Sequence, residues 1–337
     1  MSKLLEVSTD QINVFKTLFE TLGETLDNIN MIFCRTDKNN EDSSVNTGFI
    51  KISEINSSNT VVVNLKLEAA GFTNFYCAEE KVSIGINLSI FNLILKIIAK
   101  RDVGILTMYI DYNNTKNLKI IIQKEQKKSI FGIDLFDLKN ATINIPNVHM
   151  DSRIIMPSNE FHKTCKRMYD ITEFVELQCL GNEFVMKFVS DQDNCITTMQ
   201  YPITNTKHSN KKINTKGTYQ LNNLVAFKKL TTMTDIVEIY TKQNYPLVLE
   251  YKIPFGRLFL FFSPVTSDDE DNCDEDLSEN DKELEEENLV FQENYKKMEE
   301  EKLVLQENYK KLEEENEKLK IANKYANELI ETLLNQK

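Results

Sequence analysis

The sequence predicts an α+β protein in which a domain of two helices and antiparallel strands occurs twice, followed by an acidic linker and a C-terminal coiled-coil helix. Three observations predict this arrangement. Four amphipathic helical patterns stand apart among alternating strand patterns, an acidic stretch begins where the apolar patterning stops, and the last segment repeats apolar residues every seven positions. A chain of 337 residues with 41% hydrophobic content can bury one large core or two ordinary ones.

The four helical segments carry apolar side chains at helical spacing and have recognisable start signals. In the first segment the apolar residues share one face, and Thr9 or Asp10 would cap its start. Asn87 or Ser89 marks the start of the second segment. The four segments are residues 9–27, 87–100, 158–171 and 221–230. They supply the two helices of each predicted domain.

The passages between the helical segments alternate apolar and polar residues, as half-buried strands do. Examples are NTVVVNLKLEAAGF, ILTMYIDY and DIVEIYTK. A helix followed by a run of strands, four times over, indicates two copies of a two-helix domain. Residues 135–152 contain a proline and weak helical signals, so we predict domains at residues 1–134 and 153–265 with an interdomain connector at 135–152.

The stretch YPLVLEYKIPFGRLFLFFSPV, residues 245–265, predicts a β-hairpin at the end of the second domain. Apolar and polar residues alternate up to Ile253, the tripeptide PFG turns the chain, and a second strand runs from Arg257 to Phe262. The next residues, TSDDEDNCDEDLSEND, are almost all acidic or polar. We therefore predict that residues 266–281 form a disordered acidic linker.

The final segment, residues 282–337, has the seven-residue repeat of a coiled coil. LVFQENYKKMEEEK is followed directly by LVLQENYKKLEEEN, a tandem copy two heptads long. Each heptad of a coiled coil has two core positions, and here the second of them is mostly polar. This predicts a weak zipper that associates with itself or with a partner. A single charge-rich surface helix is the alternative. The predicted seam consists of Leu284, Phe291, Met298, Leu305, Leu312, Leu319, Ala326 and Leu333.

The net charge of −12 is distributed unevenly along the chain. Residues 266–337 hold 24 acidic and 10 basic residues, a charge of −14. Since the whole chain has 52 acids and 40 bases, residues 1–265 hold 28 acids and 30 bases, a charge of +2. The body is thus close to neutral, and net charge neither indicates nor excludes binding to DNA.

Several protein classes find no support in the residues. There is no signal-peptide pattern and no apolar stretch of membrane-spanning length, so we expect an intracellular protein without membrane association. The six cysteines form no CxxC pair, which argues against a disulfide framework or a zinc site. GxSxG, GxxxxGK[ST], GxGxxG and HExxH motifs are missing, and His149, His162 and His208 do not cluster. We therefore expect a protein that is not an enzyme.

Four separated motifs in one order resemble landmarks of a known family. GFTNFYC, VSIGINLSIFNLILKII, MPSNEFHKTCKRMYDI and YPLVLEYKIPFGRLFLFFSPV are similar to successive segments of the eukaryotic-type DNA sliding clamp family, proliferating cell nuclear antigen. The resemblance covers about residues 4–265, and the tail has no counterpart beyond the usual acidic end. The abundance of Asn, Lys and Ile also resembles proteins of large DNA viruses, which encode such clamps.

The resemblance implies a two-domain DNA-clamp fold, in which each domain has two helices and two antiparallel sheets. Three such subunits would close head-to-tail into a homotrimeric ring around double-stranded DNA, with helices lining the hole and sheets forming the shell. The strands near residues 129–134 and 195–201 would form the edges between subunits. The implied function is that of a sliding clamp and DNA polymerase processivity factor, with no catalytic residue, cofactor or metal.

A sliding clamp needs a positive bore that contacts phosphates without reading the sequence. The candidate DNA-binding residues are Lys16, Lys96, Lys100, Lys163, Lys166, Arg167, Lys228 and Lys229. Five of them, including Lys16 and Lys229, match basic bore positions of the family. Gly23, Leu93 and Asn222 stand where the family usually has bases, so this bore would be less positive. Alternatively, these lysines are ordinary solvated residues on polar helix faces.

The resemblance also implies a groove for client proteins, which insert aromatic and aliphatic anchors beneath the interdomain connector and pair with the end of the last strand. The candidate groove residues are Ile55, Thr60, Ile143, Ile145, Pro146, Pro246, Phe261 and Pro264. Phe261 replaces the usual tyrosine and EINSSNT replaces a more typical Asp-Ser-Ser-His, so client preference could differ. An ordinary core hairpin is the alternative interpretation of the apolar strand residues.

The expected partners are duplex DNA, a DNA polymerase, a clamp loader, motif-bearing replication and repair proteins, and a coiled-coil partner of the tail. The expected location is a DNA replication site, in a nucleus or a cytoplasmic viral factory. Two rival functions remain open: a checkpoint-type subunit of a hetero-ring, and a coiled-coil scaffold with a clamp-like head.

Overall fold

The computed structural model describes residues 3–36, 48–99, 102–125, 127–136, 148–181, 183–189, 196–202 and 214–265. The chain divides into two compact units, Met1–Thr266 and Ser267–Lys337. The acidic linker and the coiled-coil seam lie outside the described residues, so both stay predictions. The fold described below belongs to the first unit.

Four α-helices form where the sequence predicts helical segments, although each is shorter than its segment. They are α1 (Ile12–Leu22), α2 (Leu88–Leu95), α3 (Ser158–Tyr169) and α4 (Leu221–Ala226), and two short 3-10 helices accompany them, η1 (Ala69–Gly71) and η2 (Lys228–Thr232). Asn87 caps α2 as predicted, since its side-chain oxygen accepts a hydrogen bond from the backbone N of Ile90 at 3.1 Å. The predicted cap of α1 is wrong. That helix begins after Gln11, and the Thr9 hydroxyl oxygen instead accepts from the Gln11 backbone N at 3.0 Å.

The described strands form three sheets, in which every pairing is antiparallel. The order of the five-stranded sheet is β5 (Asn74–Cys77), β1 (Lys3–Thr9), β7 (Gly104–Asp111), β8 (Asn114–Lys124) and β9 (Lys128–Asp134). The order of the four-stranded sheet is β13 (Ile196–Pro202), β12 (Glu183–Val189), β11 (Phe174–Leu180) and β14 (Asn214–Gln220). The order of the eight-stranded sheet is β10 (Ser152–Pro157), β15 (Ile236–Thr241), β16 (Leu247–Ile253), β17 (Gly256–Phe262), β4 (Val61–Glu68), β3 (Gly48–Ile55), β2 (Asn28–Arg35) and β6 (Lys81–Asn87).

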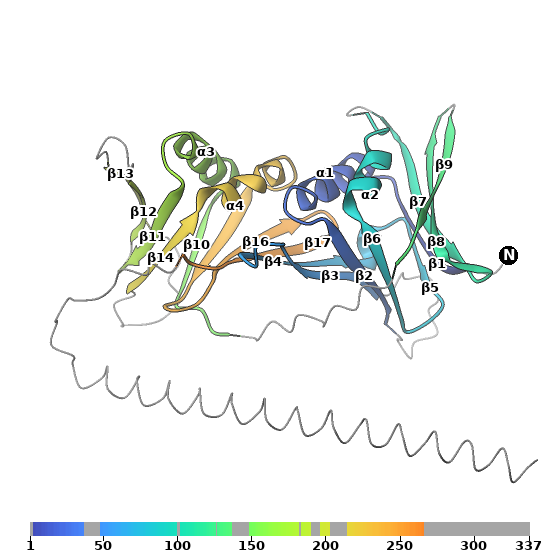
Figure 1. Ribbon diagram of the computed structural model, residues 1–337, viewed down its shortest axis with the longest axis horizontal. Helices are drawn as coiled ribbons and strands as arrows, with labels where there is room; N and C mark the ends of the chain where they lie inside the picture. Colours follow the sequence, from blue (N-terminus) through green and yellow to red (C-terminus); the bar gives the residue numbers. More distant parts are fainter. Residues whose placement is uncertain are drawn as a thin grey trace, which may run out of the picture. The chain divides into compact units, whose positions relative to one another are not determined.

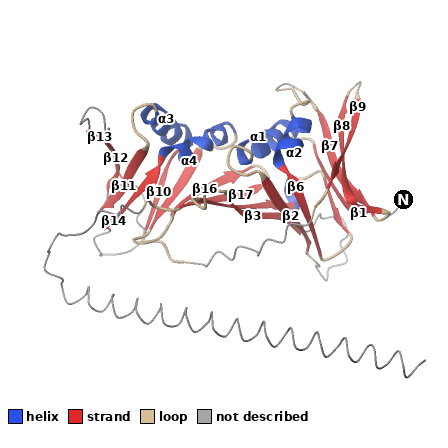
Figure 2. Ribbon diagram, in the orientation of Figure 1, coloured by secondary structure: helices blue, strands red, loops and turns tan. Residues whose placement is uncertain are grey.

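The eight-stranded sheet corrects the expectation of two separate sheets in each domain. Strand β17, in the half formed by the predicted second domain, pairs with β4, in the half formed by the predicted first domain. The pairing runs along the whole of β17, from Gly256 opposite Leu67 to Phe262 opposite Val61. Left apart, each of these strands would expose a row of unpaired backbone N–H and C=O groups, which is costly. One expected sheet of each domain therefore joins with one of the other, and the two halves share the single eight-stranded sheet (Figure 2).

All four helices lie on the same side of the eight-stranded sheet, with the two smaller sheets at either end (Figure 1). Aromatic rings fill the space between helix and sheet. The ring centroids of Phe15 and Phe19 lie 4.6 Å apart, Phe19 and Phe91 lie 5.0 Å apart, and Phe15 meets Phe255 at 5.9 Å. Farther along, Phe227 packs edge-on against Phe262 of β17 at 6.0 Å. One face of the sheet is thus core, and its opposite face is the outer face.

The predicted hairpin at residues 245–265 is confirmed as β16 and β17, joined by a tight turn. Gly256 lies at this turn with a φ of 156°, and a Cβ atom there would lie 2.1 Å from the carbonyl oxygen of Lys66. Only glycine allows the hairpin to approach β4 so closely. Among the described residues no helix is long and apolar enough to cross a membrane.

Candidate nucleic-acid and partner interfaces

Helix α3 presents bases on the side that faces away from the core. Lys163, Lys166 and Arg167 are exposed, at the i, i+3 and i+4 spacing that places side chains on one helix face. The Lys166 Nζ lies 5.9 Å from the centroid of the Tyr169 ring. This helix gives three of the predicted DNA-binding residues a common orientation toward solvent.

The 3-10 helix η2 adds two further predicted bases. Lys228 is exposed. Lys229 is half-buried, and its Nζ donates to Glu24 Oε1 at 2.8 Å. Glu24 follows α1, so this ion pair joins the helical layers of the two halves while neutralising part of the charge that Lys229 offers to a phosphate.

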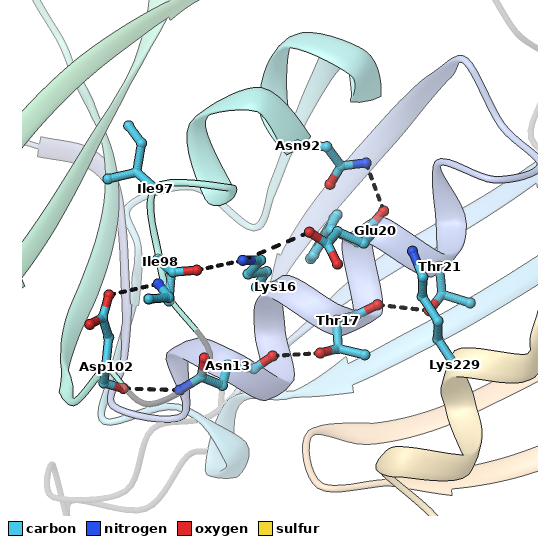
Figure 3. A network of polar contacts seen from close by, with 12 residues as sticks. Asn13, Lys16, Thr17, Glu20, Thr21, Asn92, Ile97, Ile98, Asp102 and Lys229 are labelled. Carbon is cyan, nitrogen blue, oxygen red and sulfur yellow. Dashed lines mark hydrogen bonds and ion pairs between the residues drawn. The ribbon is translucent and has the colours of Figure 1, made fainter.

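Lys16 is less available than its position on α1 suggests. Its side chain is only 18% exposed, its Nζ donates to the backbone oxygen of Ile98, and Glu20 Oε1 lies 3.9 Å away (Figure 3). The carbonyl groups after the end of α2 lack helical partners and carry negative partial charge, which attracts the ammonium group. The role of Lys16 in contacting DNA stays a prediction.

A polar network holds the chain after α2 against α1 (Figure 3) and, through Lys124, against β8. Asn13 Nδ2 donates to the Asp102 backbone oxygen at 2.9 Å, and Asp102 Oδ2 accepts from the backbone N of Ala99 at 2.7 Å. Lys124 Nζ bonds the same carboxylate and also the Ile97 carbonyl oxygen at 3.1 Å. The hydrogen bond from Lys124 is the largest cause that lowers the pKa of Asp102. Lys100, another predicted DNA contact, lies outside the described residues.

Helix α2 exposes an aliphatic stripe where a positive surface would be expected. Ile90 is 52% exposed, Leu93 66% and Ile97, just past the helix end, 39%. Their i, i+3, i+7 spacing places them on one face. Lys96, at the C-cap, is exposed beside them. Leu93, which stands where the clamp family usually has a base, is thus part of a continuous aliphatic stripe on the helical side of the molecule.

The outer face of the eight-stranded sheet brings several predicted groove residues together. Ile55 of β3 lies opposite Val62 of β4, which lies opposite Phe261 of β17, which in turn lies opposite Val248 of β16. Directly opposed residues share one face of a sheet, so these four form a continuous apolar row. We call Ile55, Val62, Phe261 and Val248 the apolar row. Ile55 at its end is 42% exposed.

The remaining groove candidates divide into two groups. The Ser263 backbone N donates to the Thr60 backbone oxygen at 2.9 Å, which places Thr60 beside the chain as it leaves β17 toward the exposed Pro264. Pro246 directly precedes Leu247, which lies opposite Phe262. The groove candidates Thr60, Pro246 and Pro264 therefore lie next to the apolar row. Ile143, Ile145 and Pro146 lie outside the described residues.

A buried charged network, which was not predicted from the sequence, lies beside the apolar row. Glu238 and Glu250 are directly opposed on β15 and β16, with side chains 7% and 6% exposed. The Tyr240 hydroxyl lies 2.8 Å from an oxygen of each carboxylate and shares its single proton between them, and Lys252 Nζ donates to Glu238 Oε1 at 2.7 Å. Burial opposes ionisation of Glu238, but the hydrogen bonds from Lys252, Tyr240 and Arg153 outweigh it and lower its pKa to about 2. The available sequence signal was a single acid within each of two apolar strand patterns, Glu238 in VEIY and Glu250 in LEYK.

Strands β9 and β13 each form one edge of their sheet, at the positions that the resemblance assigns to subunit edges. Each is paired on one side, β9 with β8 and β13 with β12. Each also exposes an isoleucine, since Ile130 and Ile196 are both 60% exposed. The chain thus carries two apolar strand edges at opposite ends of the described fold (Figure 1).

His162 belongs to the core. Its Nε2 lies 2.8 Å from the Tyr251 hydroxyl in a hydrogen bond between two buried side chains. Burial lowers the pKa of His162 to about 4, and the backbone of Leu224 offsets this only in part. Among the described residues no group of three or more His, Cys, Asp and Glu side chains is placed to hold a metal ion.

Comparison with known proteins agrees with this architecture. The family model for the N-terminal domain of proliferating cell nuclear antigen matches residues 4–147, and the model for its C-terminal domain matches residues 144–265. A structure of proliferating cellular nuclear antigen from Entamoeba histolytica has a TM-score of 0.66 and 22% sequence identity, covering 79% of this chain and all of that one.

Two curated relatives come from large DNA viruses. A probable DNA polymerase sliding clamp of Acanthamoeba polyphaga mimivirus is 30% identical over 292 residues, which cover 78% of this chain and 62% of the relative. Probable DNA polymerase sliding clamp 1 of Paramecium bursaria Chlorella virus 1 is 30% identical over 275 residues, covering 78% of this chain and 98% of the relative. The chain thus spans less than two thirds of the mimivirus relative and nearly all of the chlorella virus one. On the matching domain models and these relatives, the chain belongs to the proliferating cell nuclear antigen family.

Proposed function

We propose that this protein is a sliding clamp and DNA polymerase processivity factor, a ring-forming subunit that encircles duplex DNA. The observation that carries the proposal is the division of the fold into two faces. Bases on α3 and η2 lie on the helical side, and an apolar row lies on the opposite, outer face. A clamp needs this separation, because DNA passes on one side while clients dock on the other.

On the helical side, the exposed bases contact phosphates electrostatically. Lys163, Lys166, Arg167 and Lys228, with Lys96 from α2, are the described candidates with exposed side chains. Contacts between flexible side chains and the phosphate backbone carry no sequence information, so the ring remains bound while it slides. The role needs no catalytic residue, and any energy for opening the ring comes from a separate loader.

Ring closure uses the two strand edges. Pairing β9 of one subunit with β13 of the next satisfies the unpaired backbone groups of both strands and buries Ile130 and Ile196. Because the two edges differ, the contact is head-to-tail and closes into a ring if the rotation between subunits is one third of a turn. The proposed assembly is a homotrimer.

Clients dock on the outer face. A short peptide with aromatic and aliphatic anchors fits the apolar row, and its backbone can pair with the chain that follows β17. A DNA polymerase, a clamp loader and motif-bearing replication and repair proteins are the proposed clients. The predicted coiled coil of the tail adds a tether, which would raise the local concentration of a helix-bearing partner at a replication site.

The function is tested by topological retention on DNA. The protein is incubated with linear duplex DNA whose ends are then blocked with biotin and streptavidin, and bound protein is measured after a high-salt wash that removes electrostatic contacts. A ring is retained on blocked DNA, lost from open-ended DNA, and released when a nuclease cuts the blocked molecule. Equal loss from both DNAs would refute encirclement. A chain that stays monomeric by light scattering would instead indicate a hetero-ring subunit.

A further inference from the structure

The outer face carries four bases in direct opposition across four strands. Lys51 of β3 lies opposite Lys66 of β4, Lys66 lies opposite Arg257 of β17, and Arg257 lies opposite Lys252 of β16. We call Lys51, Lys66, Arg257 and Lys252 the basic ladder. With adjacent strands about 4.8 Å apart, the ladder is roughly 14 Å long.

Such a row is unfavourable for the fold by itself, because like charges directly opposite each other destabilise a sheet. The surrounding carboxylates reduce that cost. Lys252 pairs with Glu238 at 2.7 Å, Arg257 with Glu250 at 3.3 Å, and Lys66 with Glu68 at 2.9 Å. The Lys66 Nζ also lies 4.8 Å from the centroid of the Phe49 ring.

The compensation leaves positive charge on the solvent side. The side chains of Glu238 and Glu250 are 7% and 6% exposed, whereas those of Lys252, Arg257 and Lys66 are 58%, 62% and 49% exposed. An approaching molecule therefore meets Lys252 and Arg257 before their carboxylates, whereas Lys66 and its partner Glu68 are about equally exposed. Arg153, 43% exposed and bonded to Glu238, adds a fifth cation at the border of the ladder.

The ladder lies next to the proposed client site. Phe261 of the apolar row and Arg257 of the ladder are on the same strand and the same face, four residues apart, so about 13 Å separates them. An extended peptide covers this distance with about four residues.

We propose that the basic ladder binds an acidic segment of client proteins, located about four residues from the apolar anchors that occupy the apolar row. The proposal rests on the apolar row being a client site. Peptide is favoured over nucleic acid because the ladder is short, lies on the side of the sheet opposite the helical bases, and has carboxylates beneath its cations that would repel a run of phosphates. The ladder thus selects clients by charge at a second point, beyond the anchors.

The test uses the full chain and three fluorescent peptides, with binding measured by anisotropy. The first peptide carries an apolar and aromatic anchor motif, a spacer of about four residues and a run of glutamates. The second has glutamines in place of the glutamates. The third carries the glutamates without the anchors, and so reports on the ladder independently of the apolar row.

The glutamate peptide is expected to bind about tenfold more tightly than the glutamine peptide at low salt, with the difference shrinking as salt screens the charges. Lys51→Gln combined with Lys66→Gln should remove this difference and leave binding of the glutamine peptide unchanged. Both substitutions spare the partners of the buried carboxylates. Lys187→Gln with Lys216→Gln is the matched control, because these two bases pair with Glu176 on the four-stranded sheet, and it should retain the difference.

Equal affinity of the two anchored peptides for the unchanged protein would overturn the ladder proposal and leave the client site intact. If neither anchored peptide binds, the client site is wrong, and the third peptide then tests the ladder by itself. Weaker binding of the third peptide to the Lys51→Gln, Lys66→Gln protein than to the unchanged protein at low salt supports the ladder proposal. Equal binding of the third peptide to both proteins overturns the ladder proposal. A loss of affinity for duplex DNA in that variant, without a change in peptide preference, would make the ladder a nucleic-acid surface and overturn the proposal.

Discussion

At the scale of single residues, His162 shows how the core uses a titratable side chain without giving it a charge. The histidine lies on α3 but points inward, where its Nε2 meets the Tyr251 hydroxyl at 2.8 Å. Burial keeps its pKa at about 4, below the ordinary value of 6.5. The ring is therefore neutral at physiological pH, and the same helix can carry exposed bases without bringing charge into the core.

The buried histidine predicts a specific pH dependence of stability. The folded-state pKa is lower than the unfolded one, so above pH 6.5 both states are neutral, and below it the unfolded state binds a proton that the folded state does not. Stability is therefore lost as the pH falls from 6.5 toward 4. From about pH 7.5 to about pH 5 the loss from this residue is about 2 kcal/mol in the free energy of unfolding.

Urea unfolding at the two pH values measures this loss, with His162→Gln as the control. The variant should be less stable at high pH, because it loses the packing and hydrogen bond of the imidazole, but its pH dependence should be smaller by the predicted amount. Since both proteins share all other titrating groups, an identical pH dependence would show that His162 is not the cause.

We expect that replacing Leu93 by a basic residue raises the affinity of the protein for DNA. It is 66% exposed in the aliphatic stripe of α2, on the helical side of the fold. Leu93→Lys should tighten binding to duplex DNA and steepen the dependence of log K on log salt by about 0.9 for each additional phosphate that the new lysine neutralises. Filter binding at several salt concentrations measures both. Leu180→Lys, at the end of β11 that lies away from α3 and 46% exposed, adds the same charge outside this stripe and should leave the slope unchanged; equal effects would place α2 outside the DNA-contacting surface.

At the scale of elements, the proposed assembly depends on two of the sheet-edge strands, β9 and β13. Strands β9 and β13 are regular, paired on one side, and each exposes an isoleucine on the subunit surface. An exposed apolar strand edge is a template for another strand, and a ring uses it without leaving any edge open. The edges, rather than the helices, therefore hold subunits together in the proposed ring.

Ile130→Asp on β9 should weaken this assembly. Placing a carboxylate in an apolar strand contact leaves a charge without a partner in the interface, whereas in the free subunit the same side chain is solvated. We expect the variant to be folded by circular dichroism and to shift from trimer to monomer by size exclusion with light scattering. Val103→Asp is the control, since Val103 is 79% exposed in the connection before β7. A trimeric Ile130→Asp protein would exclude β9 as the subunit edge.

At the scale of the whole molecule, the first unit should be self-sufficient. The described sheets and helices all lie within Met1–Thr266, and both candidate subunit edges belong to it. Deleting residues 267–337 should therefore preserve the oligomer, although it removes 24 acids and 10 bases and with them a charge of −14. Light scattering of the truncated protein measures this. A truncated chain that is monomeric would mean that the predicted coiled coil, and not the strand edges, holds the subunits together.

The local features of this protein were readable from the sequence because they depend on near neighbours. Apolar spacing located the four helices, Asn87 marked a helix start, and PFG marked the hairpin turn. Each of these rests on the conformational preferences of a few adjacent residues. The cap of α1 was predicted wrongly because β1 extends through Thr9 and the helix begins only after Gln11, whose side chain makes no capping hydrogen bond.

The sequence by itself thus determined the helix and strand pattern, the acidic composition of the tail and the set of candidate DNA-binding bases. The tertiary structure decided how these combine. Only the register of β4 against β17 joins the two halves into one sheet and places Lys51, Lys66 and Arg257 in a line. Only packing turns Lys16 toward the Ile98 carbonyl and Lys229 toward Glu24. The pairing of β4 with β17 and these two side-chain contacts join residues far apart in the chain, and side-chain periodicity along a chain carries no information on such pairings.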